Sequence, residues 1–422
     1  MAKKVIVKIP NVTEEVRIGY SFNYMIKVMA ETEAADDVQW DFADVTFLHP
    51  FFLAPLAIYK NTSGKDIECI NISLRIQSYL NSICFDRMLH FGQEKREDIE
   101  AVMQKYTDKT YLPLCSFAMT DSNKDTFGSI MKTVLMKQAN IGQGGSSSLS
   151  YLISELLDNI YEHSQSPNGY VFSQYLEKEG VINLCIADTG INIAGSFKKA
   201  GLYQQEIDGN EAEALKLANE GYSTKNRPEA ENRGYGISTS KAMLVTGMKG
   251  GFFMLSGGAF HRYENGANDY IDLGNIFRWK GTVILMRIPV VLPKGFNYID
   301  YLEEGGDDMK QTIRLQDIYS ADLYTRSRAS ELRKCINDDA DEVTLDFEGI
   351  GFMSRSFADE VCNIIDDMGG KTFTLVNQNS DVATMMTKVR DGRSRERKRG
   401  VENAKMYEFQ DMESLSEFLI AM

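Results

Sequence analysis

The chain has 422 residues, of which 43% are hydrophobic and 25% are charged, and its formal net charge is −14. This length favours two to four domains, and the composition is typical of globular proteins and argues against extensive disorder. The acidic charge argues against broad binding to a nucleic-acid backbone, although it does not exclude a local basic patch.

Six cysteines are scattered along the chain, without a C-x-x-C motif or a nearby histidine partner. This spacing is typical of free thiols in a reducing compartment and not of a disulfide framework or a zinc site. The N-terminal lysines are followed by no long apolar segment, so we expect no signal peptide. No run of about 18 apolar residues occurs, so we expect no membrane-spanning helix. Together these features predict a cytoplasmic protein without a membrane partner.

Residues 1–110 alternate short strand-like and helix-like stretches. KVIVKIP, VQWDF and DIECINI have strand character, whereas SFNYMIKVMAETE and PFFLAPLAIYKN have helical character. A β-α-β-α order of this kind predicts a small α/β layer.

Residues 149–164, LSYLISELLDNIYEHS, have apolar side chains at the i, i+3, i+4, i+7 spacing of a helix with one buried face. Glu155 and Asn159 stand four residues apart beside that face, without a lysine or arginine between Leu149 and Ser164. Such a pair suits a metal ion and a water molecule, and a solvated surface stripe is the alternative. The Gly/Ser stretch before it, 141–148, predicts a loop that ends in the N-cap of this helix.

Residues 181–193, VINLCIADTGINI, predict a mostly apolar strand that ends in Asp188-Thr189-Gly190. An aspartate at a strand exit can accept a hydrogen bond from an exocyclic amine, and Gly190 allows a flat base to approach the backbone. Many α/β strands end in D-x-G, so this motif is informative only together with others.

A glycine-containing loop, Gly234-Tyr235-Gly236, leads directly into a helical stretch that begins at Ile237. Backbone N–H groups at such a helix start can bind phosphates, and the helix dipole favours their negative charge. Lys225 lies upstream in a polar segment that we expect to fold over a nucleotide.

The strand TVILMRIP begins at Thr282, whose hydroxyl can lie beside Asp188. The order of motifs is therefore E-x-x-x-N on a helix, D-x-G after a strand, a polar lid, G-x-G before a helix, and Gly-Thr before a strand. This order resembles the ATP-binding domain of the GHKL superfamily, which includes gyrase, MutL, sensor histidine kinases and anti-sigma-factor serine kinases.

The resemblance implies a role for each matching residue. Asn159 would bind the Mg²⁺ that bridges the phosphates, and Glu155 would orient or deprotonate the attacking water or hydroxyl. Asp188 would read the adenine amine, with Thr282 and a water supporting it. The remaining expected nucleotide contacts are Gly190, Asn192, Lys225, Gly234, Tyr235, Gly236 and Ile237. Asn192 replaces the usual second glycine of D-x-G-x-G, and we expect the turn to survive because asparagine tolerates the left-handed conformation.

An internal repeat is also expected, because residues 38–42, VQWDF, match residues 343–347, VTLDF. With the same offset, Val45, Phe47, Leu48 and Phe52 match Ile350, Phe352, Met353 and Phe357. Two unrelated buried strands, each followed by a short turn and a helix, are the alternative interpretation.

The second copy, EVTLDFEGIGFMSRSFADEV, resembles the STAS-like family of unknown function over residues 308–395, and the first copy resembles it loosely. In anti-sigma-factor antagonists with the STAS fold, a phosphorylatable serine opens the helix after this strand. Arg355 and Pro50 occupy that place here. Ser354 and Ser356 flank Arg355, and for them we expect an N-cap role.

These patterns predict an α/β protein of three domains. They are a STAS-like domain at 1–112, a GHKL (Bergerat) α/β sandwich with a mixed sheet at 113–295, and a second STAS-like domain at 296–422. The last domain includes the basic run 388–400, for which a solvated helix end is the simplest interpretation.

The function expected from the resemblance is that of a regulatory ATPase or switch. ATP and Mg²⁺ would be its cofactors, and closure of the lid would reposition the flanking domains. One alternative is a serine protein kinase that acts on a STAS-like partner, and another is a scaffold that binds ATP without hydrolysing it. A protein partner is expected through the STAS-like domains. A homodimer is a further alternative, because gyrase-like members of the superfamily dimerise when they bind ATP.

Overall fold

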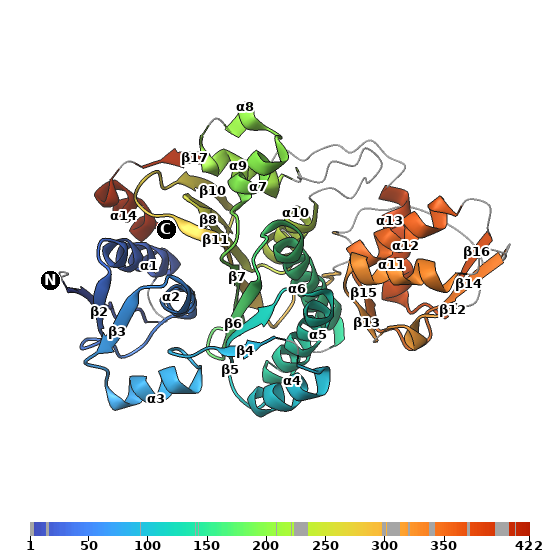
Figure 1. Cartoon of the computed structure of the whole chain (residues 1–422), viewed down its shortest axis with the longest axis horizontal. Coiled ribbons are helices and arrows are strands. Elements are labelled where there is room, and N and C mark those ends of the chain that lie inside the picture. Colours follow the sequence, from blue (N-terminus) through green and yellow to red (C-terminus); the bar gives the residue numbers. More distant parts are fainter. Residues whose placement is uncertain are drawn as a thin grey trace.

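The computed structural model describes residues 4–13, 17–92, 94–139, 141, 143–207, 209–220, 222, 235–297, 301, 313–319, 321–336, 342–368, 372–392, 405–409 and 411–422. Over these residues the chain is a mixed α/β fold around one large mixed sheet (Figure 1). The expected α/β class is therefore confirmed.

The central sheet has nine strands in the described part of the chain, in the order β17-β10-β9-β8-β11-β7-β6-β5-β4. Their bounds are β4 (Leu89–Phe91), β5 (Tyr111–Ala118), β6 (Asn168–Leu176), β7 (Val181–Asp188), β8 (Gly251–Gly257), β9 (Ala259–Glu264), β10 (Ala267–Asp272), β11 (Trp279–Pro289) and β17 (Lys405–Glu408). The pairs β4–β5 and β10–β17 are parallel, and the other neighbours are antiparallel.

The central strands are covered on both faces, which explains the nearly continuous apolar run of β7. Ile182, Leu184 and Ile186 point to one face and pack with the helices of the middle of the chain. Cys185 and Ala187 point to the other face and pack with the N-terminal residues. Because successive side chains of a strand alternate between faces, a strand in the middle layer needs apolar residues at every position.

The helices on the first face are α4 (Arg96–Met103), α5 (Asp121–Gln138), α6 (Gln143–His163), α7 (Ile193–Ala200), α8 (Gln204–Ile207), α9 (Glu211–Asn219) and α10 (Tyr235–Ala242). Helix α6 begins at Gln143, so the expectation of a loop over 141–148 is wrong for most of that stretch. The Ser150 hydroxyl donates to the Ser146 carbonyl at 3.0 Å, one turn earlier in the helix. Ser148 and Ser150 are fully buried, so tertiary packing outweighs the low helix propensity of this composition.

The N-terminal unit, residues 5–82, is a parallel sheet of β1 (Val5–Lys8), β2 (Asp37–Asp41) and β3 (Asp66–Ile70) with three helices. The helices are α1 (Ile18–Glu33), α2 (Pro50–Thr62) and α3 (Leu74–Ser82). Helices α1 and α2 lie between this small sheet and the central sheet (Figure 1).

The C-terminal unit, residues 313–392, has the same kind of sheet, formed by β12 (Ile313–Arg314), β14 (Glu342–Asp346) and β16 (Thr372–Val376). A second pair, β13 (Asp322–Leu323) and β15 (Phe352–Met353), lies beside it with α11 (Arg326–Cys335), α12 (Arg355–Asp367) and α13 (Ser380–Gly392). This unit lies on the side of α5 and α6, away from the N-terminal unit (Figure 1).

The two units repeat the same backbone hydrogen bonds, which confirms the expected internal repeat. The Phe42 N–H donates to the Ile70 carbonyl at 3.0 Å, and the Phe347 N–H donates to the Val376 carbonyl at 2.9 Å. Helices α2 and α12, which follow at the same offset, have 13 residues each.

The side chains after each central strand repeat as well. Asp41 accepts hydrogen bonds from the Ala43 N–H and the Asn71 amide. In the second unit Asp346 accepts from the Glu348 N–H and the Asn377 amide. Both asparagines are left-handed, with φ values of 55° and 54°. Two unrelated strands would not share this whole pattern.

The end of the chain returns to the first unit. Strand β17 pairs with β10, and α14 (Met412–Ala421) packs on α1 so closely that a Cβ on Gly19 would lie 1.8 Å from the Leu419 carbonyl oxygen. Strand pairing thus places β4 and β17 in the central sheet. The three-domain division at 112/113 and 295/296 stays a prediction.

None of the six cysteines forms a disulfide. Over the described residues, no helix has both the length and the apolar character needed to cross a membrane.

Candidate functional site

A pocket opens where the C-terminal half of α6, the end of β7, the start of α7 and the start of β11 meet. Five of the expected site residues line it: Asn159, Asp188, Asn192, Ile237 and Thr282. Its other walls are mostly apolar, with Ile160, Ser164, Ile191, Ile193, Ser196, Phe197, Ala218, Tyr222, Met254 and Ile284. A mostly apolar pocket with a few convergent polar groups is the usual form of a small-molecule site.

Asp188 is the last residue of β7, and only 2% of its surface is exposed. Its Oδ1 accepts a hydrogen bond from the Gly190 N–H at 2.8 Å. Burial raises the pKa of Asp188 to about 7, although the N–H groups of Gly190 and Thr282 favour the ionised form. The carboxyl group is therefore partly protonated near neutral pH, inside a largely apolar cavity, and its ionised form can accept a hydrogen bond.

Two glycines allow the backbone to close around Asp188. A Cβ on Gly281, whose φ is +96°, would lie 2.4 Å from both the main-chain oxygen and Oδ1 of Asp188. A Cβ on Gly190 would lie 1.9 Å from the Ser164 carbonyl oxygen. Gly190 is thus needed because the chain crosses the end of α6, and it does not line the pocket. The expected approach of a flat base to Gly190 stays a prediction.

Thr282 reaches Asp188 through its backbone, and its side chain makes a different contact. The Thr282 hydroxyl lies 2.8 Å from the Ser256 hydroxyl on β8, and Ser256 Oγ accepts from the Ile193 N–H at 3.0 Å. Ser256 is therefore a supporting residue that the sequence interpretation missed. The available signal was a single serine at the end of the apolar strand GFFML.

Asn192 has φ −75° and ψ 172°, so the expectation of a left-handed residue is wrong. Its Oδ1 instead caps α7 by accepting from the Gly195 N–H at 2.6 Å. Its amide nitrogen donates to Glu211 Oε1 at 3.2 Å, and Arg278 pairs with the same oxygen at 2.7 Å. An N-cap requires extended backbone and a short polar side chain, which explains asparagine here.

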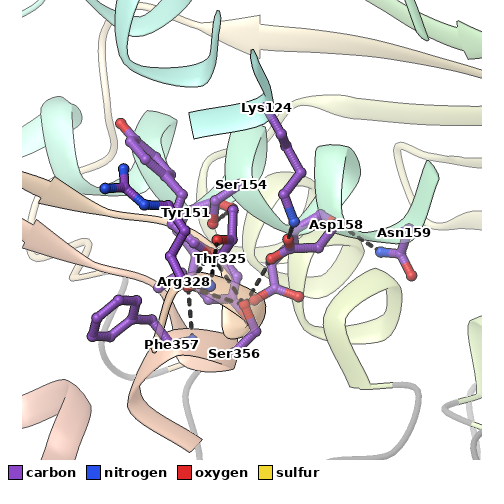
Figure 2. A network of polar contacts seen from close by, with 12 residues as sticks. Lys124, Tyr151, Ser154, Asp158, Asn159, Thr325, Arg328, Ser356 and Phe357 are labelled. Carbon is purple, nitrogen blue, oxygen red and sulfur yellow. Dashed lines mark hydrogen bonds and ion pairs between the residues drawn. The ribbon is translucent and has the colours of Figure 1, made fainter. Parts of the chain in front are cut away.

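The Glu155/Asn159 pair on α6 is divided between two environments. The Asn159 amide donates to the Glu155 main-chain carbonyl at 2.6 Å, and Asn159 lines the pocket. Figure 2 shows Asn159 turned away from the Asp158 side chain, on another side of the helix. Glu155 is only 7% exposed and does not line the pocket. The structure thus brings one member of the expected pair to the site.

The glycine-containing loop is described only in part. Lys225 and Gly234 lie outside the described residues. Tyr235 and Gly236 begin α10, as expected for a loop that leads into a helix, and Ile237 on its first turn lines the pocket.

In the parts of the chain that the structure describes, no group of three or more histidine, cysteine and acidic residues could hold a metal ion. The expected metal ligand, Asn159, would bind through its side-chain oxygen, because its nitrogen is engaged by the Glu155 carbonyl. A single amide oxygen is a hard ligand of the type that suits Mg²⁺.

No protein-family model matches the sequence, and no curated protein sequence matches it significantly. The family resemblances therefore stay predictions, and the function has to be argued from the pocket.

Proposed function

We propose that the pocket binds Mg-ATP and that the chain is a nucleotide-controlled switch of the GHKL type, flanked by two STAS-like units. The convergence of Asn159, Asp188 and Thr282 on one pocket carries this proposal. They come from α6, β7 and β11, and the order of motifs had assigned them to the metal end and the adenine end of a nucleotide site.

The adenine would lie at the Asp188 end. The ionised carboxyl group would accept a hydrogen bond from the exocyclic amine, and apolar side chains such as Ile191, Met254 and Ile284 would contact the faces of the base. Burial of Asp188 makes this hydrogen bond strong, because little water competes for the carboxylate.

The phosphates would lie toward Asn159 and the start of α10. The Asn159 oxygen would contribute one ligand to Mg²⁺, which usually keeps several waters and phosphate oxygens as its other ligands. The first N–H groups of α10, a helix of eight residues, would favour the negative charge of the phosphates.

Calorimetry with Mg-ATP and purified protein tests this proposal. Asn159→Ala should abolish the Mg²⁺-dependent part of binding, and Asp188→Ala should weaken binding by roughly tenfold or more. Asn363→Ala is the matched control, because it removes an amide from α12, outside the pocket-lining residues. Unchanged ATP affinity in both site variants would refute the nucleotide site.

A second candidate is a scaffold that binds ATP without hydrolysing it. The position of Glu155 favours it, because a general base must reach the attacking water and Glu155 does not line the pocket. Labelled ATP distinguishes the functions. Released phosphate supports an ATPase, label on the protein supports a serine kinase, and bound intact ATP supports the scaffold. In an ATPase, Glu155→Ala should retain binding and lose turnover.

A further inference from the structure

The C-terminal unit shares a hydrophobic core with α5 and α6, and charged and hydroxyl side chains add contacts between them. Arg328 of α11 pairs with Asp125 of α5 at 3.3 Å. Asp322 of β13 pairs with Lys132 of α5 at 3.1 Å. Ser147 of α6 also contacts Asp381 of α13. We call this contact between the C-terminal unit and α5/α6 the C-terminal seam.

Asp158 of α6 connects this seam to the candidate nucleotide site. One of its carboxylate oxygens pairs with Lys124 of α5, and the other accepts from the Ser356 hydroxyl of α12 at 2.7 Å. Figure 2 shows Asp158 between Lys124 and Ser356. The next residue, Asn159, lines the pocket. Any displacement of α12 therefore acts on the helical turn that carries Asn159.

The same edge of the C-terminal unit lies near the candidate general base, Glu155. Arg355, the first residue of α12, is 5% exposed. Burial raises the pKa of Tyr151 well above its usual value; the Glu155 carboxylate acts in the same direction, and the Arg355 guanidinium opposes it. Arg355 and Glu155 thus both interact with one buried tyrosine of α6, and Glu155 is itself buried.

We propose that the C-terminal unit is a built-in inhibitor of the nucleotide site, which is released by opening of the C-terminal seam. This proposal rests on the function proposed above and adds its regulation. In the docked state Glu155 is buried and does not line the pocket, and Arg355 of α12 acts on the same tyrosine, Tyr151, as Glu155. Release of the unit would uncover Glu155 and free the turn of α6 that carries Asn159, so that bound ATP can be hydrolysed.

The test is a charge reversal with a compensating swap. Asp322→Lys places a cation opposite Lys132, and reversal of one partner in such a pair should shift the docking equilibrium roughly thirtyfold. We expect faster hydrogen exchange in α6 and α12, and ATP turnover that rises about tenfold or more. The double variant Lys132→Asp with Asp322→Lys should restore both values. Neither residue lines the pocket.

Arg328→Glu, opposite Asp125, is an independent second reversal in case the first variant does not fold. Arg333→Glu is the matched control, because Arg333 pairs with Asp367 inside the C-terminal unit and both side chains are exposed. Faster exchange without faster turnover would overturn the inhibitory role. Unchanged exchange in both folded reversals would overturn the releasable seam. Absence of ATP binding by the unaltered protein would refute the nucleotide function and the inhibition of turnover, and the exchange data would still decide whether the seam opens.

Discussion

The two repeat units have the same internal architecture, but they are attached to the rest of the molecule in different ways. The N-terminal unit is attached through aromatic rings: Phe22 lies 4.9 Å from Phe253 and 4.7 Å from Phe260, between ring centres. The C-terminal unit is attached through ion pairs and hydroxyl groups as well as through apolar residues, which share one hydrophobic core with α5 and α6.

This difference shows that a repeated core does not determine how a unit is attached. The core and the strand-end hydrogen bonds maintain the unit itself, whereas the residues on its outer helices determine its partner. Fully buried aromatic contacts cannot open without exposing a large apolar surface to water. The ion pairs and hydroxyl contacts of the C-terminal seam lose less on opening, because water can replace their hydrogen bonds. We therefore expect the N-terminal attachment to be permanent.

The largest effect should come from breaking the aromatic attachment. Phe22 is fully buried among rings of the N-terminal unit and of β8 and β9. Phe22→Ala should lower the free energy of unfolding by about 3–5 kcal/mol, as measured by urea denaturation. Leu74→Ala is the control, because Leu74 is 91% exposed and should change stability little. A loss below about 1 kcal/mol for Phe22→Ala would contradict a tightly packed attachment.

The next largest loss of stability should come from breaking the buried ion pair beside the C-terminal seam. Lys124 and Asp158 are both buried, and Asp158→Ala would leave the Lys124 charge without this partner. We expect a loss of about 3 kcal/mol or more in the free energy of unfolding. The double variant Lys124→Met with Asp158→Leu should recover much of this loss. Equal losses in the single and double variants would show that the charge of Lys124 is not the cause.

Docking of the C-terminal unit at the C-terminal seam should also depend on pH. Burial raises the pKa of Asp125 to about 7, although Arg328 and Lys124 favour the ionised form and Asp158 opposes it. Asp125 also lies within electrostatic reach of Tyr324. Between about pH 4 and pH 7, docked Asp125 thus holds a proton that a released, hydrated Asp125 has given up, and above about pH 7 it is ionised and pairs with Arg328. Docking should therefore weaken as pH rises from about 4 to about 7 and change little above that range.

Hydrogen exchange of α12 at several pH values, corrected for intrinsic rates, measures this dependence. Asp125→Asn should remove it. Exchange in α1 and α2 is the internal comparison, because the attachment of the N-terminal unit is formed by aromatic rings. A dependence that persists in Asp125→Asn would assign it to another group.

The smallest effect should be the same in both units. Asn71 and Asn377 are left-handed residues at equivalent positions. Replacement of either by alanine should cost about 1 kcal/mol, because a Cβ-bearing residue without a polar group is strained in this conformation. Glycine at the same positions should cost less, because it adopts positive φ readily. Denaturation midpoints of the four variants would show whether the two units respond alike, and opposite responses would contradict their equivalence.

Much of the candidate site was predictable from local patterns. The helical periodicity of 149–164, the apolar strand that ends at Asp188 and the helix that begins after the glycine loop all follow from residue spacing. The strand-plus-helix repeat was also visible, because buried positions in equivalent cores keep the same register. These features depend on interactions between residues close in sequence or on which positions are buried.

Other features depend on partners that are far apart in sequence, and the interpretation failed there. Asn192 was expected to be left-handed, but its partner Glu211 and its role as a cap of α7 require extended backbone. Gly190 was assigned to ligand approach, but the main chain of Ser164 occupies the space beside it. Neither contact has a sequence signal, because each depends on how two separate elements cross.

The amino-acid sequence by itself determined the α/β class, the repeat and the residue types that Asn159, Asp188 and Thr282 contribute to the pocket. Those features arise from periodicity, burial and short-range hydrogen bonding. Only the tertiary structure decided which of these side chains meet, that Glu155 does not line the pocket with them, and that the second unit docks on α5 and α6 through both charges and a shared apolar core. Such outcomes depend on the packing of surfaces from distant parts of the chain, which local residue patterns do not encode.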